Sequence, residues 1–242
     1  YNTTGLSNTA TVLSSSGAGS LLDMSSLQSW NARFDDNNSG VRVQSVSASD
    51  GGTIDLSSLQ SLATPARSED RVDFNITGGG RILLDSLTSI NGAGQARFNI
   101  NSGSYSLDSL EDAANMGVVL GSGATFSAPV LTQVTGNGLQ LSLAAGSTFE
   151  ADSLALLNGL SFISFESGSS FIAPSLVELT SSIVNLGAGR TFTTGELTNI
   201  TNSRFSVEDS VQFGVVSGQV AASSYNTTGL SNTATVLSSS GA

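Results

Sequence analysis

The feature that most constrains the fold is a pattern of apolar residues that recurs along the chain about every 22 residues. The first column of this pattern holds Leu22, Ile54, Ile82, Tyr105, Phe126, Phe149, Phe171, Phe192 and Phe213. A second column, five positions later, holds Leu27, Leu59, Leu87, Leu110, Leu131, Leu154, Leu176 and Leu197. A third, three positions further, holds Trp30, Leu62, Ile90, Ala113, Val134, Leu157, Leu179 and Ile200. Units this short bury their apolar residues only by stacking on one another.

A short alternating stretch lies upstream of six of the nine first-column residues. Six positions before the column it places Ile76, Leu120, Leu143, Phe165, Leu186 and Val207. Eight positions before, it places Phe74, Val118, Leu141, Ile163, Val184 and Phe205. A glycine recurs three positions before the column, at Gly19, Gly51, Gly79, Gly123, Gly146, Gly168 and Gly189. Alternation followed by a turn residue indicates a strand that ends at a corner.

The fold class that these patterns predict is all-β, a right-handed parallel β-helix with about 22 residues in a regular coil. Equivalent side chains of successive coils then lie above one another, so the rings from Phe126 to Phe192 should stack about 4.8 Å apart. A leucine-rich repeat is the main alternative, because its units have a similar length and recurrent leucines. The chain lacks the in-register Asn or Cys ladder of that repeat.

An exact duplication marks the two ends of the sequence. Residues 1–18 recur without a change as residues 225–242, which predicts tandem units of 224 residues. The steps between first-column residues, closed by the step from Phe213 to the next unit's copy of Leu22, number nine and also add to 224. We therefore expect about nine coils per unit and a register that continues into the next unit. A duplicated tag is the alternative explanation.

The domain organisation follows from the same spacings. We expect a single β-solenoid over residues 1–242, with insertions near residues 31–50, 63–73 and 218–242 where the steps are longer. Insertions in a solenoid project from one side and often carry its specific contacts.

Composition excludes most catalytic chemistry. The chain has no Cys and no His, and all eight of its basic residues are Arg, so thiolates, imidazoles and Schiff-base lysines are missing. A net charge of −11 disfavours nucleic acid and anionic membranes as partners. The apolar runs are too short to span a bilayer. We expect no catalytic residues, no cofactor and no bound metal.

A calcium site is one candidate that the sequence offers. Clustered oxygens in the segment from Asp35 and Asp36 to Gly40 suit calcium, but the segment lacks the downstream Glu of an EF-hand. A solvated turn is the preferred interpretation.

Carboxylates near the first two columns form a second candidate: Asp55, Asp85, Asp108, Glu150 and Asp152. Paired carboxylates hydrolyse or bind sugars, but no Lys, Arg or His accompanies these as in a β-helical polysaccharide lyase. We interpret them as outward charges that keep a Ser-rich surface soluble.

Two further patterns are weaker. A threonine column at Thr53, Thr125, Thr148 and Thr191 would suit an ice-binding face, but Arg81, Ser104 and Ser170 interrupt it. Asn-x-Ser/Thr sequons are weak evidence for glycosylation, because several arise by chance in a chain this rich in Asn, Ser and Thr; they begin at Asn2, Asn37, Asn75, Asn199 and Asn226.

The segment GGTIDLSSLQSL and its echoes resemble the Ser/Thr/Gly-rich β-solenoid repeats of giant secreted or surface-anchored proteins of aquatic bacteria. The resemblance implies an extracellular or cell-surface location in an adhesin stalk, a matrix or a fibre. Our first hypothesis is a structural module that elongates by head-to-tail stacking, with copies of itself as partners. A glycan- or surface-binding adhesin that acts through the inserted loops is the alternative, and an enzyme acting on polysaccharide would need converging carboxylates.

Overall fold

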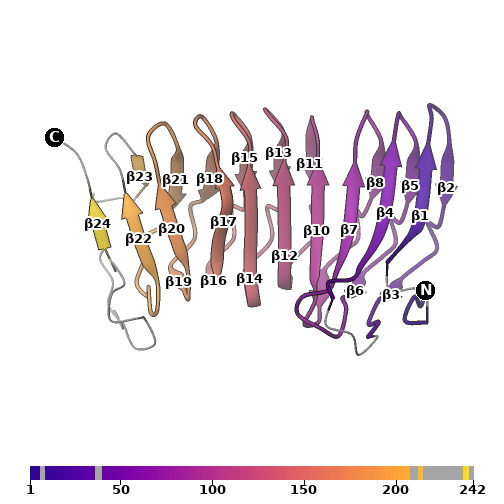
Figure 1. Cartoon of the computed structure of the whole chain (residues 1–242), viewed down its shortest axis with the longest axis horizontal. Helices are drawn as coiled ribbons and strands as arrows, with labels where there is room; N and C mark the ends of the chain where they lie inside the picture. The colour runs from indigo at the N-terminus through magenta and orange to yellow at the C-terminus, as the bar shows by residue number, and fades with distance from the viewer. Residues whose placement is uncertain (6–8, 36–39, 208–211, 215–236, 240–242) are drawn as a thin grey trace.

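The chain is all-β in the computed structural model, which describes residues 1–5, 9–35, 40–207, 212–214 and 237–239. These residues form 24 strands and no helix. Figure 1 shows the strands side by side along the long axis, from β1 (Ala10–Ser16) at one end to β24 (Leu237–Ser239) at the other. Neighbouring strands pair in parallel, with Ser47 opposite Asn75, Ile54 opposite Ile82 and Trp30 opposite Leu62. The predicted parallel β-solenoid is therefore confirmed.

The first face consists of the strands that the alternating stretches predict. Their order in the sheet is β1 (Ala10–Ser16), β4 (Val43–Ser49), β7 (Arg71–Ile76), β10 (Gln95–Ile100), β12 (Asp112–Leu120), β14 (Gln133–Leu143), β17 (Leu160–Phe165), β20 (Ile183–Leu186), β22 (Arg204–Val207) and β24 (Leu237–Ser239).

The second face carries the first column and divides into two sheets. The smaller one contains β2 (Leu21–Asp23), β5 (Thr53–Asp55) and β8 (Arg81–Leu83). The larger one contains β11 (Ser104–Ser106), β13 (Thr125–Ser127), β15 (Thr148–Glu150), β18 (Ser170–Ala173), β21 (Thr191–Thr194) and β23 (Gln212–Gly214). No described strand joins β8 to β11.

The third face carries the third column. Its strands are β3 (Ser29–Asn31), β6 (Ser61–Ala63), β9 (Ser89–Asn91), β16 (Leu156–Asn158) and β19 (Glu178–Thr180). In the two coils between β9 and β16, the third-face residues are the first residues of β12 and β14, which then bend into the first face. Asn115 lies at this bend in β12, and its side-chain amide donates to the carbonyls of Gly92 and Ala93 at 2.8 Å each.

The core is the interior of the coil stack, and the predicted columns line it. Every second-column leucine from Leu59 to Leu197 has no exposed surface, and the third column from Trp30 to Ile200 is at most 1% exposed. The corner glycines have the positive φ that a tight turn requires, for example 69° at Gly123 and 71° at Gly146.

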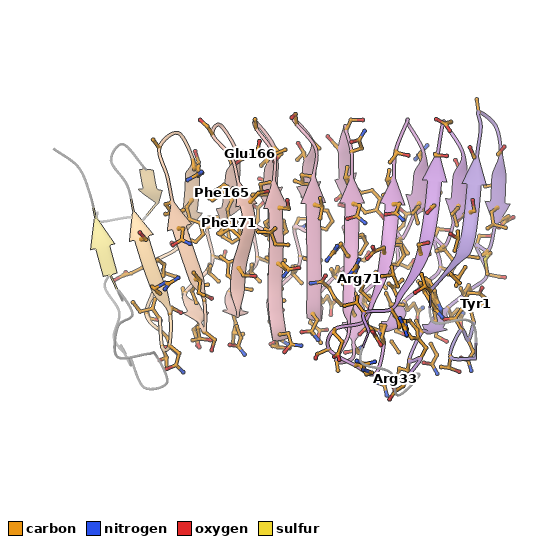
Figure 2. The ribbon with its side chains drawn as sticks, viewed as in Figure 1. Tyr1, Arg33, Arg71, Phe165, Glu166 and Phe171 are labelled. Carbon is orange, nitrogen blue, oxygen red and sulfur yellow. The ribbon has the colours of Figure 1, made fainter. Side chains whose placement is uncertain are left out.

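The phenylalanine column stacks, with two of its three ring spacings wider than the expected strand spacing. The ring centroids of Phe126 and Phe149 lie 5.6 Å apart, those of Phe149 and Phe171 5.5 Å, and those of Phe171 and Phe192 4.8 Å, all nearly parallel. Phe171, labelled in Figure 2, has no exposed surface. Burial of each ring contributes about 1.5–3 kcal/mol, and each ring pair adds about 0.5–1.5 kcal/mol.

The prediction that Ile163 belongs to the core was wrong. Ile163 is 62% exposed, because β17 contains a bulge after Phe162. Phe162 pairs with Leu141 in its place, and its ring stacks on Phe165 with centroids 4.4 Å apart. The bulge lets both phenylalanines of this strand reach the interior, which buries more apolar surface than strict alternation would.

Two of the inserted connections are shorter than the predicted ranges of 31–50 and 63–73. Strand β4 occupies residues 43–49, so the residues between β3 and β4 are 32–42. Residues 64–70 connect β6 to β7. The insertion expected near residues 218–242 lies outside the described residues, apart from β24. None of the described residues forms a helix that could cross a membrane.

Candidate functional site

Residues 1–3 lie along the outer edge of β3 and extend the third face. Asn2 forms a parallel bridge with Asn31, and the backbone amide of Thr3 donates to the Asn31 carbonyl at 2.9 Å. The Trp30 indole NH donates to the Thr3 hydroxyl at 3.1 Å, and the Tyr1 ring lies 5.7 Å from the indole. The N-terminal tripeptide therefore occupies the position of a further third-face strand.

The same sequence stands at both ends of the first face. At one end β1 contains Leu13, Ser14 and Ser15, and it pairs with β4 on one edge only among the described strands. At the other end β24 has the same three residues, 237–239, and pairs in parallel with β22. Phe205 is opposite Leu237 in that pair, and Ser206 is opposite Ser238. The copy at the C-terminal end thus shows how this sequence pairs with the strand that precedes it.

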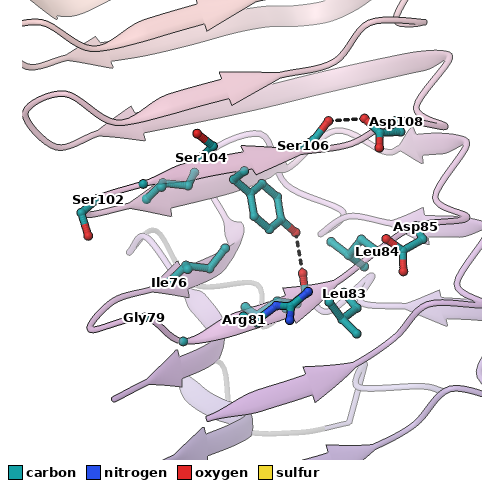
Figure 3. A pocket seen from close by; sticks show the side chains of 15 residues that line it. Ile76, Gly79, Arg81, Leu83, Leu84, Asp85, Ser102, Ser104, Ser106 and Asp108 are labelled. Atoms are coloured by element: carbon teal, nitrogen blue, oxygen red, sulfur yellow. Dashed lines mark hydrogen bonds between the residues drawn. The ribbon is translucent and has the colours of Figure 1, made fainter. Parts of the chain in front are cut away.

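A cleft of about 360 Å³ separates β8 from β11 on the second face. Figure 3 shows Arg81 and Leu83 on one side of the cleft and Ser104 and Ser106 on the other. The first and third faces stay paired at this level, β7 with β10 and β9 with β12. The stack is therefore opened on one face while the other two hold the coils together.

The corner that leads into β11 is one residue shorter than its neighbours. In a regular corner, the first-column residue comes six positions after the last inward residue of the first face. Ile82 follows Ile76 in this way, and Phe126 follows Leu120. Ile100 is in register with both Ile76 and Leu120, but only five positions separate it from Tyr105. With this shorter corner β11 keeps its ladder with β13, where Tyr105 is opposite Phe126, and it does not pair with β8.

Tyr105 bridges the two sides of the cleft. Its hydroxyl donates to the carbonyl oxygen of Ile82 at 3.0 Å, in place of a ladder hydrogen bond. Burial of the hydroxyl, and secondarily the negative charge of Asp85, raise the pKa of Tyr105 above its usual value. The side chain is therefore a neutral donor at any physiological pH.

Backbone groups on both edges of the cleft lack ladder partners. In neighbouring coils the amide two residues after the first column donates to the next coil, as from Leu56 to the Leu83 carbonyl at 3.0 Å and from Leu107 to the Ser127 carbonyl at 2.9 Å. The same register would join the Leu84 amide to the Ser106 carbonyl, but the two sheets end here. The cleft thus presents hydrogen-bond donors and acceptors along both walls.

The cleft brings together two of the predicted carboxylates. Asp85 and Asp108 both line it, each three positions after a first-column residue. Asp152 has the same position in a coil with a continuous ladder. Asp55 and Glu150 are half-buried and lie directly after the column. Asp55 accepts a hydrogen bond from the Ser57 amide at 2.9 Å.

A smaller polar depression of about 260 Å³ lies on the first face. Arg97 and Gln95 line it, and Gln95 rests over Gly117, where a Cβ atom would come within 2.8 Å of the glutamine side chain. Arg71, labelled in Figure 2, also lines the depression and is paired with Asp73 through Nε at 3.0 Å. Burial, and then the charge of Arg71, lower the pKa of Arg97.

The other candidates are dispersed. Thr125 and Thr148 are neighbours, but Arg81, Ser104 and Ser170 interrupt the threonine column in the ladder. Residues 36–39 of the calcium candidate from Asp35 to Gly40 lie outside the described residues, and so do the sequons at Asn37 and Asn226. Within the described part of the chain, no three acidic side chains gather as metal ligands.

Comparison with known proteins found no match: no family model, no curated protein and no solved structure is similar to this chain.

Proposed function

We propose that the chain is a structural module of an extracellular fibre, stalk or matrix that elongates by head-to-tail stacking of solenoid units. The observation that carries this proposal is the pairing of β24 with β22, because β24 repeats residues 13–15 of β1. The next unit's β1 then pairs with β22, with Leu13 opposite Phe205 and Ser14 opposite Ser206. Its residues 1–3 extend the third face in the same way.

Strand edges explain why stacking is favourable. An unpaired edge presents a row of backbone donors and acceptors that pair readily with another strand. In a tandem array the neighbouring unit satisfies these groups at each junction, and the apolar columns continue through it. The unit needs no catalytic residues for this role, so we propose a non-catalytic protein that binds neither nucleic acid nor a cofactor.

Electron microscopy of proteins with one, two and three consecutive 224-residue units tests the proposal. Nine coils at about 4.8 Å each predict that every added unit lengthens one straight rod by about 43 Å. Beads joined at variable angles would contradict it.

The variant Ser14→Pro in the second unit tests whether the straight rod depends on strand pairing at the junction. Proline removes the backbone donor that the junction needs, so this variant should bend or separate at the junction while each unit stays folded.

A further inference from the structure

We propose that the cleft between β8 and β11 is a binding site for one pyranose residue of a neutral glycan. This site is separate from the stacking surfaces at the two ends of the solenoid. None of its lining residues belongs to the inserted segments at 31–50 and 63–73.

The size and floor of the cleft suit a sugar ring. Its volume of about 360 Å³ lies at the lower end of the range for small-ligand sites. Ile82 and Ile100 lie beneath the cleft and are 2% exposed, so the half-buried Tyr105 offers the apolar surface. The carbon–hydrogen face of a pyranose would pack against the Tyr105 ring, with its hydroxyls directed to the walls.

The walls supply the polar partners that a sugar needs. Each sugar hydroxyl both donates and accepts, so it can pair with the free amides and carbonyls of the two strand edges alike. Asp85 and Asp108 add carboxylate acceptors, which form stronger hydrogen bonds with hydroxyls than neutral acceptors do.

The charge of the site selects against acidic sugars. Two carboxylates and one guanidinium, that of Arg81, line the cleft, and the whole chain has a net charge of −11. A uronate or a sulfated sugar would be repelled, and a neutral sugar would not.

A peptide strand fits the cleft less well. The Tyr105 hydroxyl already occupies the Ile82 carbonyl, one of the acceptors that an inserted strand would need. The intact ladders of the first and third faces also oppose the widening that a whole strand requires.

Titration by solution NMR tests the site with named probes: cellotriose, maltotriose and chitotriose as neutral glycans, trigalacturonate as the acidic one, and a peptide with the sequence of residues 123–130. We expect one neutral trisaccharide to shift the amide signals of Leu84 and Ser106 saturably. Trigalacturonate and the peptide should not.

Three variants make the test specific. Asp85→Asn and Asp108→Asn should each weaken binding about tenfold or more, since each loses a charged hydrogen-bond acceptor. Asp152→Asn, the equivalent change in a coil with a continuous ladder, should leave the affinity unchanged.

A glycine inserted between Asn101 and Ser102 restores the regular corner and should abolish binding by closing the cleft. The proposal is overturned if no neutral trisaccharide binds, if the peptide binds instead, or if the glycine insertion leaves binding intact. None of these results bears on stacking, which involves other residues.

Discussion

Individual side chains follow the sequence pattern wherever one apolar residue per coil is enough to fill the interior. The columns of Leu59 and Phe149 could be predicted because their positions repeat and the residues are large. Ile163 could not, since alternation alone cannot distinguish SFISF with a bulge from SFISF without one. Gln44 was missed as well: it is buried at an inward position, and its side-chain amide donates to the Thr3 carbonyl at 2.9 Å.

Tyr105 provides a test at the scale of one residue. Tyr105→Phe removes the hydrogen bond to the Ile82 carbonyl and should lower the free energy of unfolding by about 1 kcal/mol at pH 7. The pKa of Tyr105 is raised in the folded chain, so its contribution to stability is complete below about pH 10, the ordinary pKa of tyrosine. Above that pH the unfolded chain loses a proton that the folded chain retains, and stability falls.

Urea unfolding measures this loss of stability. The unfolding midpoints at pH 8 and at pH 10.5 are compared. The wild-type protein should lose more stability between the two pH values than Tyr105→Phe does. Tyr1→Phe, a change at an exposed tyrosine, serves as the control and should behave like the wild type. Equal losses in the wild type and in Tyr105→Phe would contradict the assignment of the Tyr105 hydroxyl as a neutral donor.

At the scale of elements, the short corner before β11 coincides with the break in the second-face ladder between β8 and β11. The five-position spacing from Ile100 to Tyr105 is present in the sequence, but a search for regular columns passes over it because glycine and serine fill the corner either way. The position of the candidate site is therefore encoded in the sequence, whereas its opening is a packing consequence that only the structure shows. The predicted range of the first insertion, 31–50, was too wide for a related reason. The length of a step does not reveal where β4 begins.

The glycine insertion between Asn101 and Ser102 tests this account of the cleft without any ligand. It should join β8 to β11, so hydrogen exchange at the Leu84 amide should slow about fivefold or more, since one ladder hydrogen bond contributes about 1 kcal/mol. The amides of Ala128 and Ala151 have the same coil position in a continuous ladder, at 2.9 Å from their acceptors, and should not change. Unchanged exchange at Leu84 would show that the short corner is not the cause of the break.

The whole molecule is a stack whose parallel register runs from β1 to β24, and its class could be predicted because period and turn residues agree. The number of coils per unit stays a prediction, since residues 215–236 lie outside the described part of the chain. The central claim is that the register crosses the boundary between units. It requires Ser206 of one unit to lie directly opposite Ser14 of the next.

Disulfide formation in a two-unit protein measures this register most directly, because the chain contains no cysteine. Adjacent parallel strands lie about 4.8 Å apart, within the range that a disulfide spans. Ser206→Cys in the first unit should therefore crosslink with Ser14→Cys in the second. It should not crosslink with Ser47→Cys of the second unit, which pairs with Ser14 one coil further on. A missing crosslink to position 14, or an equal yield at position 47, would contradict the account.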